Sequence, residues 1–407
     1  MSSTPQTARK GSSVRLTING EDVDAIESGD YSSDVLAIPD FCNLTITGLR
    51  KYRGKLQLGQ TADLYMSNPA VQGGAWVKRF SGVIVKRNPQ GKAKEGSTIA
   101  ITIADLGWHL LGKAPLWFNI KQCKNLYDLV TQMLDPSFGI KGVVGGNLNN
   151  KLRQGVAVLR AQQQERDPIY HVQIEPNEDY LTAIREYARR ANLLVNMCVD
   201  GNLQLWLPDY TKAPDYVIRN GTADSNTIAY NVTEDADKIF TLVECVGEQL
   251  FPEAEADTSD PNATKKRGKV LHPGALPFLR RLTFSDPEMT ARGKAQAMAN
   301  WQYMRQLFDA WIGVYTLPEH FQVGDNGVGK FFESDAMVDL FDDEVGAYGR
   351  MYLRAVRCKF SKGEDDTTEL VVHKPGLLSA SINPDGLAPP NILSNQIVGH
   401  PTAEGTV

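Results

Sequence analysis

The sequence predicts an α+β protein that is predominantly β, with two similar small β-barrel domains plus α/β connector modules. Three observations predict it. Short segments throughout the chain alternate apolar and polar residues, as strands with one buried face do. Two longer segments place apolar residues at helical spacing. The strand pattern near the N-terminus is also echoed near the C-terminus. At 407 residues, with 42% hydrophobic and 22% charged residues, the chain has the length of about two to four globular domains.

The first β-barrel domain is predicted over residues 14–112. Residues 14–18, VRLTI, alternate, and the following Asn19-Gly20 supplies a two-residue turn that favours positive φ. Three further segments alternate in the same way: LTIT (44–47), KLQL (55–58) and STIAITIAD (97–105). The overlapping stretch ADLGWHLLG is expected to close the domain with a short helix.

An α+β connector domain is predicted over residues 113–215. The stretch KNLYDLVTQML has three apolar residues at helical spacing, Leu126, Val130 and Met133. A second helix is predicted to begin at an Asn177 N-cap. Its apolar stripe consists of Leu181, Ile184, Ala188 and Ala191. The segments LLVNMCV and NLQLWL then flank Asp200-Gly201, which is a strong hairpin signal.

The second β-barrel domain is predicted from residues 216–250 and 309–375, which again contain strand-like runs. Residues 251–308 are expected to form an insertion loop and a helix. The loop is rich in proline and mixed in charge, and Ser285-Asp-Pro-Glu288 is a capping box at which the helix would begin. The polar residues 1–13 are expected to be a flexible N-terminus, and residues 376–407 a C-terminal tail.

The two predicted barrels share an order of short motifs. FQVGD (321–325) is similar to LQLGQ (56–60). Each is followed by a strand ending in or next to arginine, VIVKR (83–87) or RAVRC (354–358), then by a polar loop and an alternating strand. Such an internal repeat matters for function because it changes the symmetry that an oligomer can present.

Composition and motifs give no sign of a catalytic or cofactor site. The net charge is −5, and the five cysteines are scattered singly, which favours reduced thiols over a disulfide framework or a zinc site. No apolar run is long enough to span a bilayer. GDNGVGK (324–330) nearly satisfies the P-loop pattern, but Phe331 follows it where serine or threonine would hold magnesium. We therefore expect no catalytic residue, no cofactor and no metal.

Two side-chain sets are candidates for contact with other molecules. Trp301, Met304, Phe308 and Trp311 form an aromatic stripe at helical spacing, which is typical of core but also of a subunit interface. Asp335, Asp339, Asp342 and Asp343 belong to an acidic run, Glu333 to Glu344. This run lacks the ligand order of a calcium loop, so that a solvated surface and a channel lining are the two interpretations kept.

The order of parts resembles the baseplate hub proteins of contractile-tailed phages, of the Mu-like type, which are related to the base of type VI secretion spikes. The resemblance rests on VRLTINGEDV, FSGVIVKRNPQGKAKEGSTIAITIADLGWHLL, EDYLTAIREYARRANLLVNMCVDGNLQLWLPD and the stretch from FQVGD to ELVVHKP. It covers most of residues 14–375. These motifs are architectural rather than chemical.

The resemblance implies a structural, non-enzymatic hub in the tail baseplate of a virion, made as a late protein and assembled in the host cytoplasm. It implies a homotrimer in which two similar barrels per chain give a pseudo-sixfold ring. Such a ring adapts the sixfold tail tube to a threefold spike and lets DNA pass without specific binding. The implied partners are a spike protein, a tail tube or tube-initiator protein and baseplate wedge proteins, with no membrane insertion.

Two other functions stay open from the sequence. One is a tail-associated cell-wall hydrolase, because paired carboxylates that meet only in space leave no sequence motif. The other is a carbohydrate-binding β protein, which would be a monomer. A peptidoglycan-release assay and the oligomeric state distinguish these alternatives from a hub.

Overall fold

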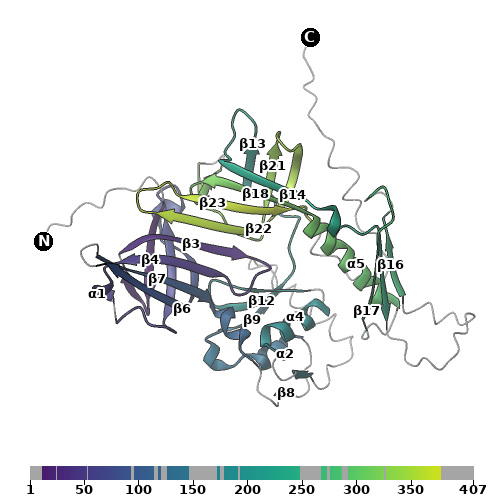
Figure 1. Cartoon of the computed structure of the whole chain (residues 1–407), viewed down its shortest axis with the longest axis horizontal. Coiled ribbons are helices and arrows are strands. Elements are labelled where there is room, and N and C mark those ends of the chain that lie inside the picture. Colours follow the sequence, from purple (N-terminus) through teal and green to yellow (C-terminus); the bar gives the residue numbers. More distant parts are fainter. Residues whose placement is uncertain are drawn as a thin grey trace, which may run out of the picture.

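The computed structural model describes residues 12–376, apart from 24, 53, 93–95, 114–117, 121–125, 146–171, 175–177, 191–192, 248–266, 273–275, 287–291 and 325–326. Within these limits the fold is predominantly β, as predicted. One 13-stranded sheet runs across the molecule, and two smaller α/β units pack beside it (Figure 1). The predicted flexible N-terminus and C-terminal tail lie almost wholly outside the described residues.

The N-terminal half of the large sheet has the order β2-β1-β5-β6-β7-β4-β3, and every neighbouring pair is antiparallel. Its strands are β1 (Ser13–Ile18), β2 (Glu21–Val23), β3 (Ile26–Asp34), β4 (Phe41–Thr47), β5 (Thr61–Ser67), β6 (Val77–Lys92) and β7 (Gly96–Asp105). Asn19 and Gly20 make the predicted turn, both with positive φ. The short helices here are α1 (Leu49–Tyr52), η1 (Gln72–Gly74) and η2 (Leu106–Leu111), the last being the predicted closing helix.

The C-terminal half has the order β14-β18-β23-β22-β21-β13, antiparallel throughout except for the parallel β21–β13 pair. Its strands are β13 (Tyr216–Asn220), β14 (Ala229–Glu234), β18 (Trp311–Pro318), β21 (Ala336–Asp342), β22 (Ala347–Ser361) and β23 (Thr367–His373). A small hairpin, β19 (Phe321–Val323) and β20 (Gly329–Phe331), follows β18 along the chain.

The two predicted barrels are two halves of one continuous sheet. Strand β22 is long enough to pair with β21 along its first part and with β3 along its second part, and the β22–β3 pair joins the halves. Among the described strands no pairing closes either half into a barrel. A single hydrophobic core runs under both halves.

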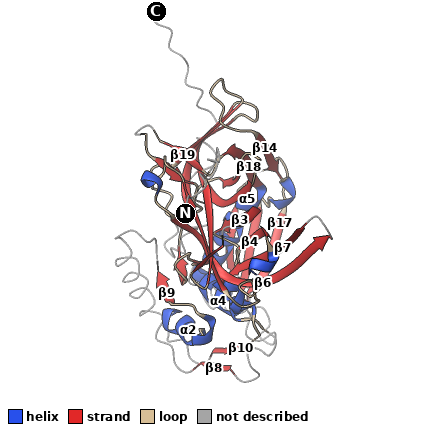
Figure 2. Ribbon diagram, turned by 90° about the vertical axis from the view of Figure 1, so that its left-hand side faces the viewer, coloured by secondary structure: helices blue, strands red, loops and turns tan. Residues whose placement is uncertain are grey.

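The predicted connector forms an α+β unit at one end of the molecule (Figures 1 and 2). It contains α2 (Leu126–Met133), η3 (Pro136–Phe138), α4 (Tyr180–Arg190), the sheet β11 (Leu194–Met197), β12 (Asn202–Trp206) and β9 (Gly142–Gly145), and the pair β8 (Phe118–Ile120) and β10 (Val172–Ile174). The predicted stripe residues Leu181, Ile184 and Ala188 are buried. Asp200-Gly201 makes the predicted turn, with Gly201 at φ 89°.

The N-cap of α4 lies two residues later than predicted. The side chain of Asp179 accepts a hydrogen bond from the Thr182 N–H at 2.7 Å, so Asp179 caps the helix, and Asn177 lies outside the described residues. None of the helices in the described part of the chain has an apolar stretch that could span a bilayer.

Part of the predicted insertion loop is a third sheet. Strands β16 (Arg267–Leu271) and β17 (Arg281–Asp286) flank β15 (Leu242–Gly247), which the sequence had placed in the second barrel, and η4 (Ala236–Lys238) precedes β15. Ser285 pairs with Val246 as a strand residue, so the predicted helix start there is wrong; α5 spans Arg292–Ala310. Helix α5 packs on this sheet and links it to β18 (Figure 1).

Candidate functional site

The candidate site is the junction of the two halves, since the protein's role is expected to depend on a repeated unit. Residues of β22 from Ala355 to Ser361 pair antiparallel with residues of β3 from Asp34 to Ser28. The pairing begins just after a bulge at Arg354. A bulge bends the strand and increases its twist, and here it lets one strand follow two partners.

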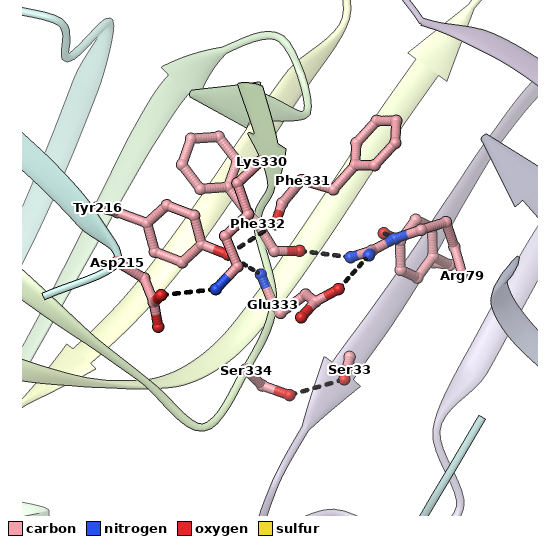
Figure 3. Close-up of polar contacts among 10 residues, drawn as sticks. Ser33, Arg79, Asp215, Tyr216, Lys330, Phe331, Phe332, Glu333 and Ser334 are labelled. Atoms are coloured by element: carbon pink, nitrogen blue, oxygen red, sulfur yellow. Dashed lines mark hydrogen bonds and ion pairs between the residues drawn. The ribbon is translucent and has the colours of Figure 1, made fainter. Parts of the chain in front are cut away.

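A buried arginine connects the halves (Figure 3). Arg79 of β6 is 8% exposed and donates three hydrogen bonds: to the Tyr31 hydroxyl at 3.0 Å, to the Glu333 carboxylate at 2.8 Å and to the Phe332 carbonyl at 2.5 Å. Burial by itself lowers the pKa of Arg79, but the neighbouring Tyr31 and Glu333 outweigh burial and hold that pKa above its usual value. The guanidinium therefore stays charged and cross-links β6 and β3 to the segment before β21.

That segment is held on its other side by β13 (Figure 3). The Tyr216 hydroxyl donates to the Phe331 carbonyl at 2.6 Å and accepts from the Glu333 N–H at 3.0 Å. Lys330 forms an ion pair with Asp215 at 2.6 Å. The Ser334 and Ser33 hydroxyls lie 2.8 Å apart, which ties the segment directly to β3. These groups position main chain and leave no arrangement of nucleophile and base.

At the end of the junction, three aspartates are linked one to the next by hydrogen bonds. Arg354 binds Asp34 through two nitrogens, at 2.8 and 3.1 Å, and the Asp34 N–H donates to the Asp40 carboxylate at 3.1 Å. The Asp40 N–H in turn donates to Asp105 at 2.9 Å, and Asp105 also accepts from the Gly107 N–H at 2.8 Å. Burial nonetheless raises the pKa of Asp105 to about 7, and burial also raises the pKa of Asp40 well above its usual value.

Most side chains of the aromatic stripe are buried within the fold. Met304, Phe308 and Trp311 are buried, the last at the start of β18 rather than on the helix, whereas Trp301 is half-buried. Phe308 stacks on His373 with ring centroids 3.8 Å apart. The interface assignment stays a prediction, and Trp301 is the member of the set with side-chain surface for it.

The four aspartates of the acidic run have different surroundings. Asp342 is fully buried and accepts hydrogen bonds from Tyr315, Asn220 and two main-chain N–H groups. Asp335 is half-buried beside Lys212 at 3.4 Å, and burial raises its pKa to about 6. Asp339 is half-buried and Asp343 is exposed. They do not form one exposed cluster, and within the described residues no group of His, Cys, Asp and Glu is placed to hold a metal ion.

The P-loop-like segment lies between two strands. Its described glycines belong to the β19–β20 hairpin, and the Gly329 N–H donates to the Ala70 carbonyl at 2.8 Å. No helix follows β20, so the segment is the glycine-rich turn that its context indicated rather than a phosphate-binding loop. The four cysteines in the described ranges, Cys42, Cys198, Cys245 and Cys358, are free thiols, and Cys123 lies outside those ranges.

The repeat suggested by the short motifs exists in the strand order. The order β5-β6-β7-β4-β3 in one half matches β21-β22-β23-β18-β14 in the other, with antiparallel pairs throughout. Both long strands carry a bulge at the same place: between Ile84 and Lys86 in β6, and between Leu353 and Ala355 in β22. The chain thus contains one structural unit twice, joined by the β22–β3 pair.

Solved structures share this fold over nearly the whole chain. The tail protein from Neisseria meningitidis MC58 is 20% identical, with a TM-score of 0.69, and the match covers 91% of this chain and 98% of that one. The 43 kDa tail protein of prophage MuSo2 from Shewanella oneidensis is 16% identical, with a TM-score of 0.67, over 90% of this chain and 99% of that one.

A more distant match extends the likeness beyond phages. The E. coli c3393 protein, a component of the type VI secretion system, is 10% identical, with a TM-score of 0.51, over 88% of this chain and 76% of that one. No protein-family model matches the chain, and no curated protein matches it in sequence. The chain has the fold of these phage tail proteins, as the sequence resemblance predicted.

Proposed function

We propose that the protein is a structural, non-enzymatic hub of a contractile phage-tail baseplate. Three copies form a ring of six similar units, which adapts a sixfold tail tube to a threefold spike and leaves a channel for DNA. The observation that carries the proposal is the doubled strand order within one chain. Because each copy contributes two equivalent units, a threefold assembly presents pseudo-sixfold symmetry.

The comparisons support a role in a tail. The two tail proteins compared above are each matched over nearly their full length. Other similar chains come from PdpA–VgrG complexes, two of them named as Francisella complexes, at 8–9% identity. From these we infer contact with a spike protein on one face of the ring and with a tail tube or tube-initiator protein on the other, with wedge proteins at the edge. The proposed place of the protein is the virion, after assembly in the host cytoplasm.

The channel is proposed to be lined in part by acidic side chains. Asp339 and Asp343 are the two predicted residues with carboxylates that are neither fully buried nor in an ion pair with Lys212. Three chains also triple the net charge of −5. Carboxylates repel phosphates, so such a lining would keep DNA from binding as it passes. A basic channel in an image of the assembled particle would contradict this assignment.

The proposed ring is tested by the mass and the shape of the assembled particle. We expect light scattering on the purified chain, alone and with the spike protein, to give three copies per particle, and electron microscopy to show a ring with six similar lobes. A chain that stays monomeric alone and with the spike protein contradicts the ring. Release of peptidoglycan fragments that a single carboxylate substitution abolishes would instead establish the hydrolase alternative.

A further inference from the structure

Two strand segments lie at open edges of the sheet. Strand β14 pairs only with β18 among the described strands, and β6 beyond its bulge pairs with β7 on one side alone. Five of the six β14 residues are exposed, and Tyr230 is 45% exposed. A strand open at its edge and on both faces is a template for pairing with another chain.

These two edges are the counterparts of the two strands at the junction. In the N-terminal half, the residue before the bulge lies in a row across four paired strands: Ile84, Ile103, Cys42 and Tyr31. In the C-terminal half, the corresponding row is Leu353, Val372, Gly313 and Val232. Counting from the bulges therefore makes β6 equivalent to β22, and β14 equivalent to β3, residue by residue.

We propose that β14 of one copy pairs with β6 of the next copy in the register that β3 and β22 use within the chain. The partner is a second copy of this chain, and the inference rests on the proposed ring. Tyr31 faces Cys358, which is five residues after Leu353. The residue five positions after Ile84 is Pro89, so Val232 of one copy faces Pro89 of the next.

The transferred register brings opposite charges together. Glu234 falls opposite Arg87, and Asp235 falls opposite Lys86. Arg87 has donors to spare beside the one it gives to Gln57 at 2.7 Å, although Glu234 also lies near Lys374 of its own chain. Thr233 falls opposite Asn88, and both are exposed and polar. Oppositely charged cross-strand pairs stabilise a sheet, whereas like charges in that position destabilise it.

The register also matches a large residue with a small one. Within the chain, Phe360 of β22 faces Gly29 of β3, where a Cβ on the glycine would come within 2.9 Å of the Phe360 ring. In the proposed pair the order is reversed: Tyr230 of β14 faces Gly91 of β6. Each junction thus has one aromatic ring and one glycine, placed on opposite strands.

Proline at position 89 limits the hydrogen bonds that this edge can form with any partner. Lys362 donates its N–H to the Glu27 carbonyl at 2.7 Å, so alternate residues from Val356 to Lys362 direct their main-chain groups toward β3. By equivalence, the nitrogen of Pro89 faces the open edge and cannot donate there. Proline at such positions blunts an edge against indiscriminate pairing, and costs the proposed ladder one hydrogen bond.

Cysteine cross-linking tests the register directly. Asn88→Cys with Thr233→Cys places two thiols at a non-hydrogen-bonded pair, where side chains lie closest. We expect mild oxidation of this double variant at high protein concentration to give dimers and trimers on a non-reducing gel, with three copies as the limit. The matched controls are each single variant and Asn88→Cys with Ala229→Cys, four residues out of register, which should stay uncross-linked.

The junction inside the chain supplies a positive control. Arg357→Cys with Ser32→Cys occupies the equivalent pair, and should form an intrachain disulfide, so that the chain still runs as a monomer on the non-reducing gel. Suppose that the control disulfide forms and light scattering shows a trimer. Absence of the 88–233 cross-link then overturns the edge pairing but leaves the proposed ring intact. Absence of both a trimer and the cross-link at about millimolar concentration overturns the edge pairing and the ring together.

Charge reversal provides a second readout. Glu234→Arg should raise the protein concentration needed for half-assembly by about tenfold or more, since each of the interfaces then opposes two cations. Adding Arg87→Glu should restore assembly, whereas Glu364→Arg, in an exposed turn, should leave it unchanged. Failure of the double variant to recover, with a folded chain by circular dichroism, counts against the register.

Discussion

At the scale of single residues, the turn residues act on the neighbouring main chain, whereas Arg79 acts across the junction of the two halves. Asn19 and Gly20 form a two-residue hairpin loop because both tolerate the positive φ that such a loop requires, and Gly201 supplies the positive φ in the longer turn between β11 and β12. Arg79, by contrast, lies 254 residues from its partner Glu333 in the chain. No local pattern distinguishes it from the neighbouring Lys78, which is partly exposed and pairs with Asp63 at 2.9 Å.

Removing Arg79 should destabilise the fold strongly. Arg79→Ala leaves the buried Tyr31 hydroxyl and the Phe332 carbonyl without their donor, and we expect a loss of about 2–4 kcal/mol of unfolding free energy. Urea denaturation of the variant and the parent measures this loss of unfolding free energy. The matched variant Lys78→Ala should cost less than about 1 kcal/mol because its ion pair is at the surface. Equal effects of the two variants would show that the buried hydrogen bonds do not hold the halves together.

Asp105 should make stability fall as pH rises through the weakly acidic range. Its pKa is about 7 in the folded chain and 3.8 without burial, so the folded state holds the proton more tightly than the unfolded state does. Its contribution is therefore present at low pH and is lost between about pH 4 and 7, by about 4 kcal/mol at most. In Asp105→Asn, the change in unfolding free energy between pH 5 and 7.5 should become less negative than in the parent. If the pH dependence of the unfolding free energy stays the same, another group causes it.

At the scale of elements, the strands with one buried face and the helices α2 and α4 could be predicted, because burial leaves a period in the sequence. Strand β14 could not: its residues AYNVTE are mostly exposed on both faces, so no alternation marks them. The third sheet was also missed. Its strand β15 has the same alternation as the strands of the large sheet, and only spatial partners decide which sheet it joins.

The β22–β3 junction depends on close approach of the strands at Gly29. A Cβ there would lie 2.5 Å from Leu44 and 2.7 Å from the Asn43 carbonyl, besides the Phe360 contact. Gly29→Ala should therefore lower the unfolding free energy by about 1–3 kcal/mol through overpacking. Gly54→Ala, where no heavy atom lies within 4 Å of the added carbon, is the control and should stay within about 0.5 kcal/mol of the parent.

At the scale of the whole molecule, the repeat could be suspected from short motifs but its geometry could not be predicted. Motif order indicated two related units, and the matching bulges and strand orders agree with that. The sequence suggested that each unit closes on itself. The structure places the two units edge to edge, since β22 extends past β21 and takes β3 as its next neighbour.

The covalent link between the two units has a consequence for the kinetics and entropy of assembly. Six separate units would close the proposed ring through five associations and one closing contact, and each association loses translational and rotational freedom worth several kcal/mol. Three chains that each already carry one docked pair need only two associations and one closing contact. Because β22 and β3 meet at an angle set during folding, each chain would enter the proposed ring with one interface already at the angle that the other interfaces repeat.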